Sequence, residues 1–254
     1  MINETDLREK LILSLDVDDI AKAYDLIEKM APYVKYYKVG LQLITKDGPR
    51  MIMTLKRKGS KIFYDGKFFD IPQTVYNACY EATRAGVDMM NVHALGGPKM
   101  IAFARRAIDD ATEKMQLPTK PLLLAVTILT SFENKDLKKH LKIAMPLKKM
   151  VLHLAGMAKK AGADGIVCSP EEVKGIKKTF GKDFIVVTPG IRLAGKMKKD
   201  DQERIKTPFD AIKDGADYIV VGRPILQAEN RVETVQEIIK QIREAYKNVA
   251  RKNP

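Results

Sequence analysis

The strongest constraint on the fold is a regular alternation of two kinds of segment. Amphipathic stretches with apolar residues at helical spacing, such as DDIAKAYDLIEKMAPY and IPQTVYNACYEATRAG, lie between short apolar runs. These runs are rich in β-branched residues and are typical of buried parallel strands. Eight of them occur, at residues 11–17, 36–44, 61–68, 89–95, 122–129, 165–169, 184–191 and 218–222. Glycines stand where a helix would end and a strand begin, at Gly59, Gly86, Gly162, Gly181 and Gly215.

Eight strand–helix units in a chain of 254 residues match the size of one (β/α)8 barrel. We therefore expect an α/β fold in which residues 1–254 form a single TIM-barrel domain. A doubly wound sheet is the alternative. It usually has fewer strands and often a glycine-rich first turn, and no GxGxxG pattern occurs in the sequence.

Charge and hydropathy argue against several classes of protein. The formal net charge of +13 would suit an acidic partner, but the lysines are scattered through helical segments, without an RNP, zinc-finger or helix-turn-helix pattern. The favoured interpretation is a solvated basic surface with no nucleic-acid partner. No apolar run approaches the length of a membrane span, and the first residues, MINETDLREK, lack the apolar region of a signal peptide.

The possible metal and thiol ligands are few and dispersed. Cys79 and Cys168 are far apart in the sequence, and neither belongs to a CxxC motif. The three histidines have no tight ligand spacing such as HExxH. These patterns predict no metal site and no disulfide framework, and they indicate a reducing, cytoplasmic location. No motif for an organic cofactor is present either, so none is expected.

Polar side chains gather at the expected strand ends. In a TIM barrel the carboxyl ends of the strands form the catalytic face, so several ionisable groups in these places indicate an active site. The residues are Asp16, Lys38, Asp65, Lys67, His93, Thr130, Ser131, Ser169, Arg192 and Arg223.

The densest group of charges lies in DGKFFDIP, residues 65–72. Asp65 and Lys67 are two apart, so they point to the same side of a strand. Asp70 stands where the chain leaves the strand, and Lys38 belongs to the neighbouring strand. Alternating charges keep one another ionised, because each cation lowers the pKa of a carboxyl and each anion raises that of a lysine. A surface ion-pair cluster is the alternative, but the position at a barrel mouth favours a functional array.

A second group indicates a phosphate site. VVTPGIR (186–192) and VVGRP (220–224) end the seventh and eighth strands, which commonly grip phosphate in this fold. Gly190 and Gly222 expose backbone N–H groups, and Arg223 supplies a bidentate donor. The long polar segment 193–206 between these strands is predicted to be a lid, with a disordered surface loop as the alternative.

These motifs together resemble the bacterial orotidine 5′-phosphate decarboxylase family. The resemblance rests on DGKFFDIPQT (65–74), LDVDD (15–19), YYKVG (36–40), VTILTS (126–131), DDQERI (200–205) and the two phosphate motifs. It covers nearly the whole chain in order. Two positions depart from the family pattern: Gly66 stands where a bulkier apolar residue is usual, and Gln73 stands where Asn is usual.

The resemblance implies a role for each matching residue. Lys38, Asp65 and Lys67 would form the charged catalytic array, with Asp70 contributed by the other subunit of a homodimer. Lys67 would stabilise the ring carbanion and protonate it. The implied substrate contacts for orotidine 5′-phosphate are Asp16 at the ribose; Thr130 and Ser131 at the pyrimidine; Arg192, Gln202 and Arg223 at the phosphate; and also Thr74, Pro189 and Gly222.

Two other functions compete with this interpretation. The related 3-keto-L-gulonate 6-phosphate decarboxylases share a DxKxxD motif but resemble magnesium-dependent barrels with an acidic residue near the end of the second strand. Lys38 occupies that place here and would repel a divalent cation. The non-enzymatic alternative is a barrel that only binds nucleotides or nucleic acid.

Overall fold

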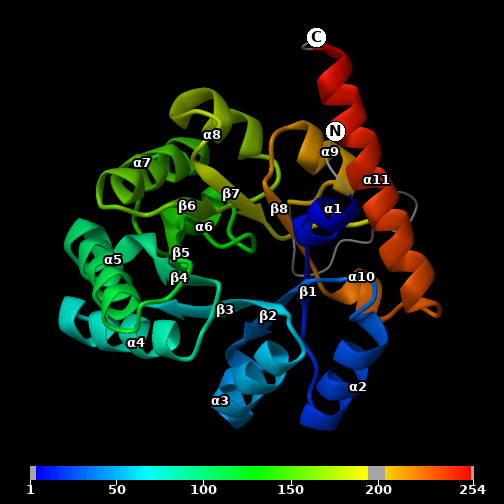
Figure 1. Cartoon of the computed structure of the whole chain (residues 1–254). Helices are drawn as coiled ribbons and strands as arrows, with labels where there is room; N and C mark the ends of the chain where they lie inside the picture. Colours follow the sequence, from blue (N-terminus) through cyan, green and yellow to red (C-terminus); the bar gives the residue numbers. More distant parts are fainter. Residues whose placement is uncertain (1–3, 194–203, 253–254) are drawn as a thin grey trace.

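Eight parallel strands form a closed barrel in chain order (Figure 1). The structure is a computed structural model that describes residues 4–193 and 204–252. Each strand pairs with the next, and β8 pairs with β1. The strands are β1 (Leu11–Ser14), β2 (Tyr36–Gly40), β3 (Lys61–Phe68), β4 (Met89–His93), β5 (Leu122–Val126), β6 (Gly165–Val167), β7 (Ile185–Thr188) and β8 (Tyr218–Val221). The predicted TIM barrel is confirmed, and the alternative doubly wound sheet is wrong, because an open sheet would leave two unpaired edges.

Helices surround the barrel (Figure 1). Those that follow the eight strands are α2 (Ile20–Met30), α3 (Leu41–Arg57), α4 (Pro72–Arg84), α5 (Gly97–Lys114), α7 (Leu147–Lys160), α8 (Val173–Phe180), α9 (Pro208–Lys213) and α11 (Arg231–Lys252). Helix α1 (Glu4–Lys10) precedes β1 and contacts α11. Three shorter pieces lie within the loops: η1 (Ala94–Gly96), α6 (Asn134–Lys139) and α10 (Arg223–Leu226).

Local sequence signals account for the helix boundaries. The Asp19 carboxylate accepts hydrogen bonds from the N–H groups of Ala21 and Lys22 and so caps α2. Pro72 occupies the first turn of α4, where its missing N–H has no intrahelical partner to lose. The five glycines predicted to end helices all have positive φ, between 69° and 108°. A residue with a Cβ is strained in that conformation, so these glycines let the chain turn from helix to strand.

Strand ends were predicted less accurately than strand starts. The run 36–44 was expected to be one strand, but β2 ends at Gly40 and α3 begins at Leu41. Apolar and polar residues alternate in Leu41-Gln42-Leu43 as they would in a strand. In the helix, however, Leu43 is buried while Leu41 is exposed, because one face of α3 packs on the barrel. Three residues after the strand are too few to reveal a helical period.

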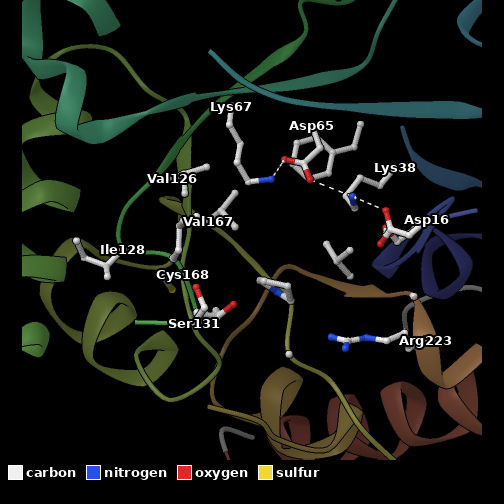
Figure 2. Close-up of a pocket in the computed structure, with 18 of the residues that line it drawn as sticks. Asp16, Lys38, Asp65, Lys67, Val126, Ile128, Ser131, Val167, Cys168 and Arg223 are labelled. Atoms are coloured by element: carbon white, nitrogen blue, oxygen red, sulfur yellow. Dashed lines mark hydrogen bonds and ion pairs between the residues drawn. The ribbon is translucent and has the colours of Figure 1, made fainter. Parts of the chain in front are cut away.

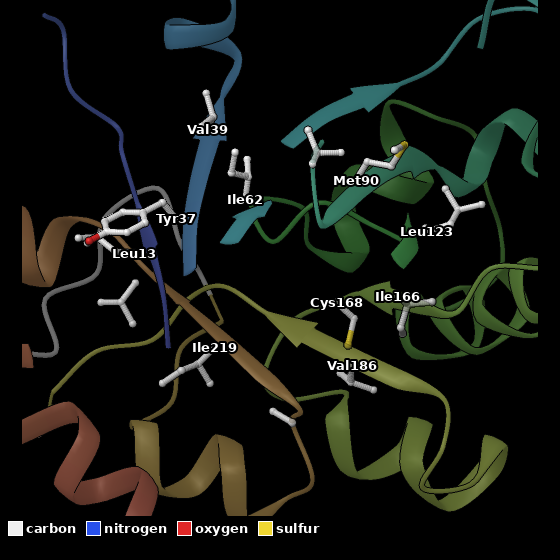
Figure 3. Close-up of a cluster of buried hydrophobic side chains, with 14 of the residues drawn as sticks. Leu13, Tyr37, Val39, Ile62, Met90, Leu123, Ile166, Cys168, Val186 and Ile219 are labelled. Atoms are coloured by element: carbon white, nitrogen blue, oxygen red, sulfur yellow. The ribbon is translucent and has the colours of Figure 1, made fainter. Parts of the chain in front are cut away.

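The core has two layers. Strand side chains that face outward, including Leu13, Met90 and Ile219, pack against the helices (Figure 3). Inward-facing residues, among them Ile12, Phe63 and Leu124, fill the barrel interior. Each buried side chain of this size contributes roughly 1.5–3 kcal/mol to folding. The inner apolar layer closes the barrel below, so the polar inward residues farther along the strands are held above a rigid floor.

Candidate active site

A cavity of about 320 Å³ opens at the carboxyl ends of the strands. Phe63 and Val220 belong both to its lining and to the inner apolar layer, so the barrel core forms its floor. The sequence-predicted residues that line it are Asp16, Lys38, Asp65, Lys67, Thr130, Ser131, Pro189, Arg192, Gly222 and Arg223. The fold thus brings together residues from six different parts of the chain.

One wall of the cavity is a row of alternating charges (Figure 2). Lys67 Nζ lies 2.7 Å from Asp65 Oδ1, and Lys38 Nζ lies 3.0 Å from Asp65 Oδ2. The same ammonium of Lys38 lies 3.2 Å from Asp16 Oδ1. Ser14, which the sequence did not single out, donates a hydrogen bond of 2.7 Å to the other oxygen of Asp16. Asp65 is therefore bracketed by two lysines, and Lys38 by two carboxylates.

The electrostatics keep this row ionised. Burial opposes the charge on Asp65, but the two neighbouring ammonium groups and the hydrogen bonds from Lys67 and Asn91 lower its pKa to about 2. Burial likewise opposes the charge on Lys38, but the carboxylates of Asp65 and Asp16 outweigh this effect and raise its pKa. At neutral pH the cavity therefore holds fixed charges of both signs, and those of Asp65 and Lys38 are largely removed from water.

The backbone at Lys67 departs from regular strand geometry. The pairing of β3 with β4 shifts register between Tyr64 and Phe68, and Lys67 has a φ of 46°. The side chain of Asn91 on β4 accepts a 2.7 Å hydrogen bond from the Lys67 N–H and donates one of 2.7 Å to Asp65 Oδ1. Sequence analysis missed Asn91. The available signal was a polar residue in an otherwise apolar strand, MMNVH.

Two glycines in or beside the charged strands lie where a larger side chain would clash with a neighbour. A Cβ at Gly40 would stand 2.9 Å from Lys38 Nζ, so a larger residue would displace that ammonium group. A Cβ at Gly66 would stand 2.8 Å from a ring carbon of Tyr64 and 3.2 Å from one of Phe68. These two rings are stacked, with centroids 5.6 Å apart. They occupy the space of the bulkier residue that is usual at position 66 in the family that the sequence resembles.

The rest of the cavity lining consists of arginine, hydroxyl and apolar side chains and lacks the alternating charges of the first wall. Arg223 begins α10 and, in Figure 2, lies across the cavity from Lys67. Arg192, which follows β7, is 8% exposed, and its guanidinium donates to the Ile191 carbonyl. Ser131 lies on a side shared with the apolar Val126 and Ile128. The cavity thus combines a charged wall, an arginine opposite it, and a side that is lined partly by apolar residues.

The predicted lid lies largely outside the described residues, and so does Gln202. The residues on either side of the undescribed part of the lid lie close together: the Arg192 N–H donates a 3.0 Å hydrogen bond to the Lys206 carbonyl. Arg204 is buried, forms an ion pair with Glu172, and donates to the Leu129 carbonyl at 3.2 Å. This contact ties the end of the segment to the loop that carries Thr130. Sequence analysis did not identify Arg204 or Glu172 as site residues.

Asp70 and Thr74 do not line the cavity of their own chain. Both are exposed, and the Asp70 carboxylate accepts a 2.6 Å hydrogen bond from the N–H of Ile71. The neighbouring side chains of Phe69 and Ile71 are 61% and 68% exposed. The Phe69 ring stacks on His93, with centroids 5.4 Å apart. An acidic residue therefore stands among exposed apolar side chains beside the barrel mouth.

The described residues contain neither a metal-ligand cluster nor a membrane-spanning helix. Within residues 4–193 and 204–252, no group of three or more His, Cys, Asp or Glu side chains is placed to hold a metal ion. In the same part of the chain, no helix is both long and apolar enough to span a membrane.

Comparison with known proteins identifies the family. The profile of the orotidine 5′-phosphate decarboxylase / HUMPS family matches residues 9–238. The chain belongs to this family. A relative named orotidine 5′-phosphate decarboxylase from Legionella pneumophila (strain Corby) is 47% identical over 233 residues, covering 92% of this chain and 99% of the relative. One of the same name from Moorella thermoacetica is 39% identical, covering 92% of each chain.

Two solved structures have the same fold as this chain. A crystal structure of orotidine 5′-phosphate decarboxylase from Lactobacillus acidophilus superposes with a TM-score of 0.81 at 38% identity, covering 92% of this chain and 99% of that one. An uncharacterized conserved protein from Geobacillus kaustophilus superposes with a TM-score of 0.80 at 33% identity, covering 91% and 99%. The family resemblance inferred from the motifs is thereby confirmed.

Proposed function

We propose that this protein is an orotidine 5′-phosphate decarboxylase. It converts orotidine 5′-phosphate into UMP and CO2, the last step of pyrimidine nucleotide synthesis de novo. The observation that carries the proposal is the row of Asp16, Lys38, Asp65 and Lys67 in the cavity. Membership of the family and the names of the relatives support it.

The charged row suits the difficulty of this reaction. The carboxyl group leaves an sp² ring carbon, and no neighbouring carbonyl can delocalise the electron pair that stays behind. When the C–C bond breaks and CO2 departs, the Lys67 ammonium stabilises the negative charge on the ring carbon. Lys67 then donates a proton to that carbon, which gives UMP, and regains a proton from solvent. Asp65, ionised and 2.7 Å away, holds the ammonium in place.

The remaining lining residues are assigned to substrate binding. Asp16 binds ribose hydroxyls, oriented by the hydrogen bond from Ser14. Thr130 and Ser131 bind the pyrimidine ring. The phosphate residues are Pro189, Arg192, Gly222 and Arg223, together with Gln202 from the lid. Binding energy from a phosphate far from the reacting carbon can be used to close the lid over the substrate.

We assign Asp70 to the active site of a partner subunit in a homodimer. Its exposure, and its place outside the cavity of its own chain, support this assignment. Exposed Phe69 and Ile71 beside it supply an apolar surface that dimer formation would bury. Two-fold symmetry makes the exchange reciprocal, so each subunit gives one Asp70 and receives one, and Thr74 crosses with it.

No metal or organic cofactor takes part in the proposed reaction. Asp16 and Asp65 are each paired with a lysine, which a divalent cation would have to displace. This arrangement argues against the magnesium-dependent alternative.

We also propose that residues 1–254 act as one catalytic domain in the cytoplasm. Cys79 and Cys168, both buried free thiols, are consistent with a reducing compartment.

The decisive experiment follows the absorbance of orotidine 5′-phosphate after purified protein is added, before and after exhaustive dialysis against EDTA. The expected result is a loss of substrate absorbance at the same rate in both samples. A dialysed enzyme that is inactive until magnesium is added would support the sugar-phosphate alternative. Binding of nucleotides without turnover would support the non-enzymatic one.

A further inference from the structure

The structure assigns a positioning function to Asn91, which lies beneath the reacting lysine. We propose that the Asn91 carboxamide sets the place of the Lys67 ammonium by holding both the Lys67 backbone and the Asp65 carboxylate. The inference deepens the proposed decarboxylase function and rests on it. Asn91 is 1% exposed and does not line the cavity, so it acts through its neighbours and not by touching the substrate.

The first half of the argument concerns the backbone. Because the β3–β4 register shifts between Tyr64 and Phe68, residues there leave the regular ladder. The Lys67 N–H donates instead to Asn91 Oδ1 at 2.7 Å. Lys67 also has a φ of 46°, which a residue with a side chain adopts only when its surroundings impose it. Asn91 is the side chain that takes the place of the missing ladder bond.

The second half concerns the carboxylate. Asn91 Nδ2 donates to Asp65 Oδ1 at 2.7 Å, and the same oxygen accepts the bond from Lys67 Nζ. One amide therefore fixes both ends of the lysine, its backbone N–H directly and its ammonium through Asp65. Holding the Lys67 N–H and the Asp65 carboxylate together requires a neutral group that both accepts and donates a hydrogen bond, as a carboxamide does. An ionised carboxylate could accept from Lys67 but would repel Asp65.

The surroundings of Asn91 make this requirement testable by pH. The charged groups near it are Asp65 and Lys67 on β3, with Lys38 on β2 beyond Asp65, and His93 lies two residues farther along β4. On β5 the paired residue is the apolar Leu124. An aspartate introduced at position 91 would be buried beside Asp65, and both burial and the like charge raise the pKa of a carboxyl group.

Three variants test the proposal: Asn91→Leu, Asn91→Asp and the control Thr83→Val. Asn91→Leu removes both hydrogen bonds and should lower kcat about a hundredfold, the effect of displacing a reacting group by about 1 Å. The Kd of UMP should change less than about twofold, because the phosphate and ribose contacts lie elsewhere. Thr83→Val removes another buried hydrogen bond, to the Cys79 carbonyl at 2.9 Å on α4, and should lower stability without changing kcat.

Asn91→Asp separates positioning from packing. The protonated carboxyl group donates to Asp65 and accepts from Lys67 as the amide does. The kcat of Asn91→Asp should therefore rise toward the wild-type value as the pH falls from about 8 to about 5. A profile parallel to that of the wild type would overturn the proposal. So would an Asn91→Leu enzyme that folds and keeps kcat within about threefold of the wild type.

A crystal structure of Asn91→Leu gives a readout that does not depend on the substrate. The contact between Lys67 Nζ and Asp65 Oδ1, 2.7 Å in the wild type, should lengthen or break. An unchanged contact would contradict the proposal even if the protein had another substrate. A wild-type enzyme that does not consume orotidine 5′-phosphate would refute the proposed function separately.

Discussion

Mixing two inactive variants tests whether the active site is shared between subunits. Lys67→Ala removes the proton donor, and Asp70→Ala removes the carboxylate that we assign to the partner's site. Each variant alone should be nearly inactive. In a heterodimer of the two, one site carries both defects, and the other has an intact lysine and an intact Asp70. Random exchange makes about half of the dimers mixed, so about a quarter of all sites are intact.

The structure supplies a matched control for this experiment. Asp65 Oδ1 lies 2.7 Å from Lys67 Nζ of the same chain, so these two residues always serve one site. A mixture of Lys67→Ala with Asp65→Ala therefore contains no intact site and should remain inactive. The assay is turnover of orotidine 5′-phosphate after the subunits have been exchanged by dilution and reconcentration, with exchange verified by differently tagged chains.

The two mixtures give opposite results only if Asp70 crosses the interface. Recovery of about a quarter of wild-type activity in the Asp70 mixture, with none in the Asp65 mixture, is the expected outcome. If the exchanged Asp70 mixture stays inactive, Asp70 serves the lysine of its own chain and the shared site is refuted. Recovery in both mixtures would mean that Lys67 and Asp65 act in different sites, which the geometry of the cavity contradicts.

Three further predictions follow from the same contacts. Lys67→Ala should lower kcat by at least about a thousandfold, which corresponds to an increase of about 4 kcal/mol in the activation free energy. The Kd of UMP, measured by calorimetry, should change little, and turnover above a tenth of normal would contradict the mechanism. Arg223→Ala should raise KM for orotidine 5′-phosphate about a hundredfold, while barely changing the slow reaction of the phosphate-free nucleoside; equal losses on both substrates would indicate a structural role. The pKa of Asp65 is lowered from 3.8 to about 2, so its ionisation stabilises the fold above pH 3.8, and this stabilisation is lost as the pH falls toward 2. Relative to Asp65→Asn, the wild type should therefore lose about 2 kcal/mol of unfolding free energy over that range in urea titrations, and parallel curves for the two proteins would disprove the shift.

The barrel and most of its cavity could be predicted because they depend on local patterns. Eight apolar runs and the glycines between them define the topology, and strand-end polar residues must then converge. Asn91 was not predicted because its importance comes from a register shift between two strands, which no local pattern reveals. Arg204 and Glu172 were missed for a similar reason: they are 32 residues apart, and their pairing depends on how two loops pack. The local charge pattern singled out Asp70, but its assignment to the partner's site came only from the resemblance, because a carboxylate that serves another subunit has no distinctive local signal.

Gly66 and the two rings that close over it restrict how this sequence can evolve. Because a Cβ at position 66 would meet both Tyr64 and Phe68, a larger residue there requires these rings to move or to lose volume. Made alone, the substitution overpacks the strand that carries Asp65 and Lys67, at a cost of typically 1–3 kcal/mol. Made after one ring has been shortened, the same substitution fills a vacancy. The three positions are therefore epistatic: an aromatic side chain must shrink before a bulkier residue replaces the glycine, and in the reverse direction the glycine must return before the full-sized ring does.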